Sequence, residues 1–163
     1  MIGSDARIEG AALPIVRLET WIDAPKERCF DLARNVEAHA ASTADSAERA
    51  VGGVTSGLLE LGDEVTWEAR HFGVRQRLTA KMVRVERPHL FVDVMVRGAF
   101  ASFTHLHEFV DERGGTLMRD VFEYRSPLGM LGVLADWMFL ERHMTRFLRR
   151  RAEYLKRAAE TRD

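Results

Sequence analysis

Two histidines separated by a single residue are the side chains in this sequence best suited to do chemistry. His105 and His107 flank Leu106 in the run FTHLHEF. On a β-strand both rings would point to the same side of the sheet, with Cβ atoms about 7 Å apart, in the company of Phe103 and Phe109. Imidazoles that lie among phenyl rings need polar partners, so the pair predicts a polar spot within an apolar interior.

Two carboxylates are predicted to share this interior. Asp93 lies in the run FVDVMVRG, on the same strand face as Phe91 and Met95. Asp120 lies on the same face as Phe122, in a run that follows a Gly-Gly turn and pairs back on the histidine strand. If that face points inward, Asp120 can meet a histidine.

These four polar side chains leave several roles open. They could form a satisfied hydrogen-bond network in the core, or orient a ligand in an apolar pocket. They could also perform acid–base catalysis, with His105, His107 and Asp120 as candidates, because an imidazole with a carboxylate partner can move a proton. We expect no metal, because a third ligand would have to come from another strand and no second cysteine supplies one.

Large apolar side chains could line a cavity around the polar spot, although aromatic residues and methionines at such spacings are also ordinary core residues. His71 is either a polar group near the opening or simply the last residue of a strand. Besides the four polar residues, the candidate ligand-binding set is Trp67, His71, Leu78, Phe91, Met95, Phe103, Phe122 and Trp137.

The elements that must position these residues follow from the pattern of the chain. A strand over Ile15–Ala24 runs into a short helix that begins at Pro25, where the missing N–H is tolerated. A weak helix near Val36–Ser42 and a short strand near Ala47–Val51 follow. Apolar and polar residues then alternate with a period of two, which predicts a run of antiparallel strands. A helix over about Leu128–Glu160 ends the chain, with one apolar stripe at helical spacing.

Composition sets the broad class. The chain has 163 residues, 46% of them hydrophobic, which suits one domain over 14–160 behind a frayed tail of residues 1–13. A formal charge of −1 offers no field for nucleic acid, and Cys29 is the single cysteine, as in a reducing compartment. The longest apolar run, Met130–Leu140, is too short to span a bilayer, so we expect a cytoplasmic protein with no transmembrane segment.

The order of elements resembles the helix-grip fold of the START-like (SRPBCC) superfamily, which includes the polyketide cyclase/dehydrase family, the coenzyme-Q-binding proteins and the birch pollen allergen family. The resemblance covers most of the chain and rests also on WIDAPKERCFDLA, LGDEVTWEARHFG, FTHLHEF, GGTLMRDVFEYRSPLG and LADWMFLERHM, of which the last three are similar to an uncharacterised bacterial subgroup. It implies an α+β fold in which a curved antiparallel sheet of about six or seven strands wraps a long C-terminal helix, with two short helices after the first strand.

The resemblance implies binding or transport of a hydrophobic or amphipathic small molecule, such as a lipid, quinone or polyketide, between the sheet and the last helix. One alternative is a cyclase or dehydratase that uses the histidines and aspartates in the same cavity. Another is a module that binds a protein partner, or its own copy as a homodimer, through the apolar start of the last helix. We expect no cofactor, because the sequence has no G-x-G-x-x-G after a strand, no Walker-type loop and no G-x-S-x-G.

Overall fold

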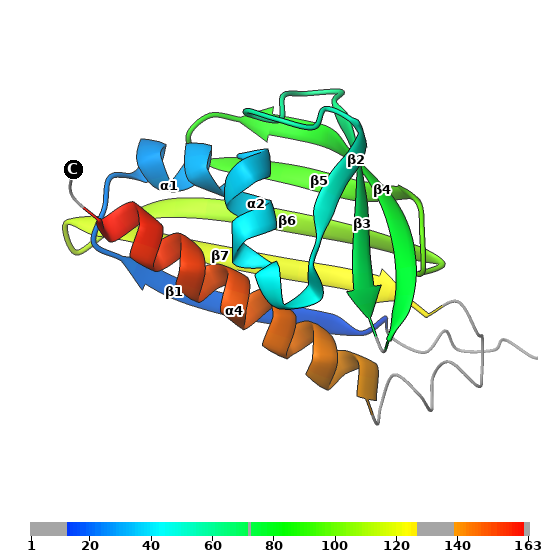
Figure 1. Ribbon diagram of the computed structural model, residues 1–163. Helices are drawn as coiled ribbons and strands as arrows, with labels where there is room; N and C mark the ends of the chain where they lie inside the picture. The colour runs from blue at the N-terminus through cyan, green and yellow to red at the C-terminus, as the bar shows by residue number, and fades with distance from the viewer. Residues whose placement is uncertain (1–12, 72, 127–138, 162–163) are drawn as a thin grey trace, which may run out of the picture.

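The computed structural model describes residues 13–71, 73–126 and 139–161 (Figure 1). The elements within these ranges are β1 (Ile15–Ile22), α1 (Lys26–Ala33), α2 (Val36–Ser42), the 3₁₀ turn η1 (Ala44–Ser46), β2 (Arg49–Gly53), β3 (Glu64–His71), β4 (Val74–Glu86), β5 (Leu90–Arg97), β6 (Ser102–Glu112), β7 (Gly115–Arg125) and α4 (Glu141–Glu160). The predicted element order is confirmed for these residues.

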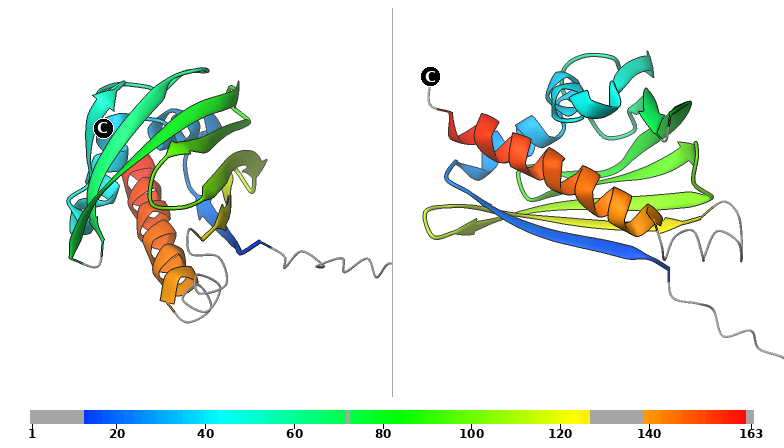
Figure 2. Two further views of the ribbon diagram at one scale, coloured as in Figure 1. Left: turned by 90° about the vertical axis from the view of Figure 1, so that its right-hand side faces the viewer. Right: turned by 60° about the horizontal axis from the view of Figure 1, so that its bottom comes forward.

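The strands of the described residues form one antiparallel sheet of seven strands, in the order β1-β7-β6-β5-β4-β3-β2. The pairing shifts register between Thr79 and Ala80 and between Met82 and Arg84 on β4. Such irregularities bend a strand and increase its twist. The sheet accordingly curls around α4, which lies on its concave side (Figure 2). The helix-grip fold predicted from the sequence is therefore confirmed.

A tight turn fixes the register of the two longest neighbouring strands. Arg113 and Gly114, between β6 and β7, have φ angles of 52° and 77°. Two positive φ angles in a two-residue loop are typical of a type I′ turn, whose twist matches that of antiparallel strands. The resulting register places His107 of β6 opposite Asp120 of β7.

Helix α4 packs on the sheet through residues spaced three or four apart. Met144, Leu148, Ala152, Leu155 and Ala159 are all buried, as an amphipathic helix that covers a sheet requires. The apolar stripe predicted for the last helix is thus confirmed over Glu141–Glu160. The predicted start of that helix, including Met130 and the rest of its apolar first turns, lies mostly outside the described residues.

The buried apolar side chains form two clusters. Phe30 of α1 anchors the first, with its ring edge-on to Phe91 and Phe109 at centroid distances of 5.6 Å. The second gathers Phe103, Phe122, Tyr124, Met144 and Leu148 and two other buried residues around β6, β7 and the first turns of α4. The candidate site is lined by members of both clusters.

Candidate ligand-binding site

A cavity of about 450 Å³ lies between the concave face of the sheet, α2 and α4. Pockets that hold small molecules commonly measure about 300–1,000 Å³ and have mostly apolar walls. Trp67 of β3, Leu78 and Ala80 of β4, and Met144 and Leu148 of α4 contribute apolar surface to this one. The cavity is thus of a suitable size and lining for a small apolar guest.

Most of the residues predicted from the sequence to bind a ligand surround this cavity. Eight of the twelve contribute to its wall: Trp67, Leu78, Phe91, Asp93, Phe103, His105, His107 and Phe122. Alternation along each strand puts them there, because residues two apart share a face.

Of the other four candidates, two lie elsewhere and two have side chains that the structure does not describe. Met95 is half-buried and packs against the second apolar cluster, beside Ala80, its partner across the β4–β5 pair, rather than lining the cavity. Asp120 is 3% exposed and lies behind the histidines instead of at the cavity surface. For His71, the structure describes the backbone at the end of β3 but not the side chain. Trp137 lies outside the described residues.

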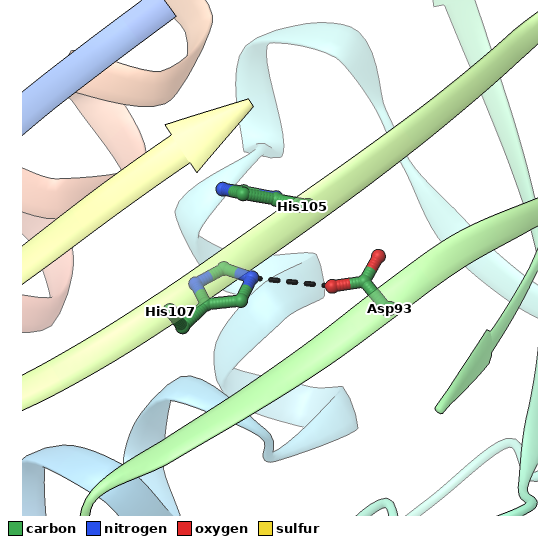
Figure 3. Close-up of side chains that lie close together, drawn as sticks. All are labelled: Asp93, His105 and His107. Carbon is green, nitrogen blue, oxygen red and sulfur yellow. Dashed lines mark hydrogen bonds and ion pairs between the residues drawn. The ribbon is translucent and has the colours of Figure 1, made fainter. Parts of the chain in front are cut away.

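The register of three strands brings the predicted polar residues together. Asp93 of β5 faces His105 across one pair, and His107 of β6 faces Asp120 across the next. The two imidazole rings are stacked obliquely, with centroids 3.8 Å apart. Nε2 of His107 lies 3.2 Å from Oδ1 of Asp93 (Figure 3). Asp93, His105, His107 and Asp120 together are called the polar cluster below.

Asp120 lies close to both histidines of the polar cluster. Its Oδ1 atom lies 2.8 Å from Nδ1 of His107 and 3.2 Å from Nε2 of His105. Both are ion-pair distances, but neither contact has the alignment of a hydrogen bond. The carboxylate therefore faces both rings at once.

Arg151 of α4 supplies a cation that the sequence interpretation did not assign to the site. Its Nη1 atom lies 3.8 Å from Oδ1 of Asp120, and its Nη2 atom donates a 2.8 Å hydrogen bond to the carbonyl of Ala33 at the end of α1. The side chain is buried on the apolar stripe of α4, between Leu148 and Leu155. The sequence could have indicated this role: an arginine among the apolar residues of an amphipathic helix is expected to be buried, and a buried guanidinium requires polar partners.

Burial and charge determine the protonation of the polar cluster. Burial, reinforced by the neighbouring His107, lowers the pKa of His105 to about 4. Burial tends to raise the pKa values of Asp93 and Asp120, but the adjacent imidazoles outweigh it and bring both below their usual range. At neutral pH the cluster therefore holds two carboxylates and a neutral His105.

We predict that Arg151→Met destabilises the protein by about 1–3 kcal/mol at pH 7. The substitution keeps an apolar stem on the stripe but leaves the Ala33 carbonyl without its side-chain donor and Asp120 without its nearby cation. Urea unfolding followed by circular dichroism measures the change. Arg149→Met, an exposed change on the same helix, should stay within about 0.5 kcal/mol of the parent. Equal stabilities of the two variants would contradict the structural role of Arg151.

A second polar group on the cavity wall was missed by sequence reasoning. The ring of His39 on α2 stacks on Trp67 with centroids 4.1 Å apart, and its Nε2 atom lies 3.4 Å from Oε2 of Glu48. Both His39 and Glu48 line the cavity. The sequence holds little signal for this pair, because it depends on how a short helix and the chain before β2 fold over the sheet.

The structure also bears on the expectations about membranes and protein partners. Within the described ranges, no helix is both long and apolar enough to cross a membrane. The apolar segment suggested as a partner surface lies mostly outside them, although Phe139 at its end is described and is 63% exposed.

Comparisons with known proteins identify the fold. No family model matches the chain, and no curated protein matches its sequence. Solved structures do match. TTHA0849 from Thermus thermophilus has a TM-score of 0.69 at 20% identity, and the match covers 90% of this chain and 99% of that one. Protein CV1439 from Chromobacterium violaceum has a TM-score of 0.71 at 13% identity, over 91% and 98% of the two chains.

A plant protein shares the same architecture. The major latex-like protein 151 from Panax ginseng has a TM-score of 0.67 at 14% identity, over 91% of this chain and 99% of that one. At such low identities the likeness shows the fold alone. It supports the helix-grip fold, while the START-like superfamily and the bacterial subgroup suggested by the local motifs stay predictions.

Proposed function

We propose that the protein binds a hydrophobic or amphipathic small molecule in the cavity between the curved sheet and α4. The observation that carries the proposal is the cavity of about 450 Å³, with apolar walls and with Asp93, His105 and His107 of the polar cluster on one part of its surface. Burial of each 100 Å² of apolar guest surface would contribute about 2.5 kcal/mol, before the entropic costs of association. Affinity would come from the apolar walls and orientation from the polar cluster.

The charge of the polar cluster selects the kind of polar group that the guest would carry. Asp93 and Asp120 provide two carboxylates, against which Arg151 provides one guanidinium cation. Asp93 is less buried than the histidine it contacts, with 19% of its side chain exposed, so its carboxylate can accept a further hydrogen bond. A hydroxyl or another donor suits this position, whereas a guest carboxylate would face repulsion. Long-chain alcohols, hydroquinones and phenolic polyketides have the right chemistry.

We predict that tag-free protein binds dodecanol at least about tenfold more tightly than dodecanoate at pH 8, because only the alcohol donates a hydrogen bond to Asp93. Displacement of a fluorescent apolar probe, followed by calorimetry, measures both constants. Saturable binding of one alcohol per chain supports the proposal. Binding of neither compound, or a preference for dodecanoate, would overturn this assignment.

Acid–base catalysis remains the second candidate because one observation favours it. His107 lies between two carboxylates, 2.8 Å from Asp120 and 3.2 Å from Asp93, which is how a proton-transferring imidazole is commonly positioned. Native mass spectrometry of protein from its own host separates the two functions. A co-purifying molecule that stays unchanged on incubation indicates binding. A molecule that is converted, with conversion lost in His107→Ala, indicates catalysis.

A further inference from the structure

We propose that Asp93, His105 and His107 bind a divalent first-row transition-metal ion at the polar end of the cavity. One ring nitrogen of each histidine and one carboxylate oxygen of Asp93 lie within 4.8 Å of one another. Figure 3 shows the three side chains close together, the histidines on β6 and the aspartate on β5. The sequence alone pointed away from a metal because no third ligand was apparent. The β5–β6 register provides one.

The distances suit coordination. With metal–ligand bonds of about 2.0–2.1 Å, two ligand atoms of a tetrahedral site lie about 3.3 Å apart. Nε2 of His107 and Oδ1 of Asp93 are already 3.2 Å apart. The largest separation within the group, 4.8 Å, would have to shorten by about 1.5 Å at most. A change of this size would have to come from the side-chain torsions, because pairing fixes β5 against β6.

Asp120 lies beside the ring nitrogen of His107 that would not bind the metal, where a ligating histidine usually contacts a carboxylate or carbonyl. Its Oδ1 atom lies 2.8 Å from Nδ1 of His107, so Nε2 of the same ring is left for a cation and faces Asp93. A carboxylate on the other ring nitrogen fixes the orientation of a ligating histidine and makes it a better donor. The buried Nδ1 of His107 and Nε2 of His105 have no aligned hydrogen bond among the described residues, although both lie at ion-pair distance from Asp120.

Charge and ligand type define the ion. The carboxylates of Asp93 and Asp120 exceed the single guanidinium of Arg151 by one negative charge, which a dication would offset. Two imidazoles with one carboxylate suit zinc, iron, cobalt or nickel, whereas calcium and magnesium prefer sets made of oxygen atoms. All three ligating residues line the cavity, so three protein ligands would leave a coordination position open to its interior.

The test is a titration of tag-free protein, first stripped with a chelator, with Co²⁺ followed by visible absorption and with Zn²⁺ followed by calorimetry. We expect one ion per chain. His107→Ala and Asp93→Asn should weaken binding by more than about 100-fold, and Asp120→Asn by about 10- to 100-fold. His89→Ala, which removes an exposed histidine, is the matched control and should bind as the parent does.

Three results would overturn the inference: no stoichiometric binding, binding unchanged in His107→Ala and Asp93→Asn, or an equal loss in His89→Ala. If a variant does not fold, the unmodified protein still decides the matter, because bound Co²⁺ must broaden the NMR signals around Asp93 and His105 and leave sharp those of the β6–β7 turn, where Arg113 lies about 20 Å along the strand from His107. The inference does not depend on the proposed apolar guest. Alcohol binding measured with chelator present succeeds or fails separately from metal binding.

Discussion

Ala80→Trp should abolish binding of an apolar guest while the protein stays folded. Ala80 is 5% exposed, lies in the middle of β4 and lines the cavity. An indole ring there would occupy much of the space of about 450 Å³ that the guest needs. We expect dodecanol affinity to fall at least about 100-fold, which corresponds to about 2.8 kcal/mol. Probe displacement measures the loss.

A second tryptophan substitution on the same strand controls for general effects of a large aromatic residue. Val83 is 45% exposed, so Val83→Trp adds the ring at the surface of β4 and should leave the affinity unchanged. Extra volume in a filled core costs about 1–3 kcal/mol, and the cavity should hold the cost of Ala80→Trp to the lower part of that range. A folded Ala80→Trp protein that still binds the guest as the parent does would show that binding occurs elsewhere.

The second large effect is a loss of stability on mild acidification. His105 has a pKa of about 4 in the folded protein, because burial and the neighbouring His107 disfavour its charged form, against 6.5 for an ordinary histidine. Between these pH values the unfolded chain binds a proton that the folded protein does not, so stability falls as the pH falls. The difference between the two pKa values corresponds to about 3 kcal/mol. Urea unfolding at pH 7 and pH 4 measures it.

Removing the imidazole identifies the source of this dependence. His105→Phe keeps a ring beside Phe122 but cannot titrate, so its stability should change less between pH 7 and pH 4 by about 3 kcal/mol. His89→Ala should follow the parent. Below about pH 4 a different process begins, because Asp93 and Asp120 have lowered pKa values and their stabilising contributions are lost only as they become protonated. A parent protein with equal stability at pH 7 and pH 4 would refute the assignment for His105.

The fold was readable from the sequence because most of its signals are local. Alternation marked β3 to β7, the Gly-rich turn after Glu112 marked the β6–β7 hairpin, and Pro25 marked the junction of β1 and α1. The short strand β2 was predicted about two residues early. Weak alternation over five residues does not fix a boundary, and the chain there is held by pairing with β3.

The sequence predicted which residues form most of the polar cluster, but not which of their atoms lie close together. Alternation placed His105 and His107 on one face, and Asp120 on the same face as Phe122, which the structure shows to be the buried one. The distances between these side chains depend on the registers of the β5–β6 and β6–β7 pairs. No local sequence pattern determines a register between two strands fully. Arg151 reaches Asp120 from a helix 31 positions later in the sequence. Only the packing of α4 across the sheet brings these two residues together.

The cavity between the two apolar clusters affects how the stability of the protein responds to pressure. Whatever part of the hollow of about 450 Å³ between the two apolar clusters is not filled by water is volume that disappears when the chain unfolds. Compression therefore favours the unfolded chain more strongly than it would for a solidly filled domain of equal length. A molecule seated between the clusters would take up that volume and make the protein more resistant to hydrostatic pressure.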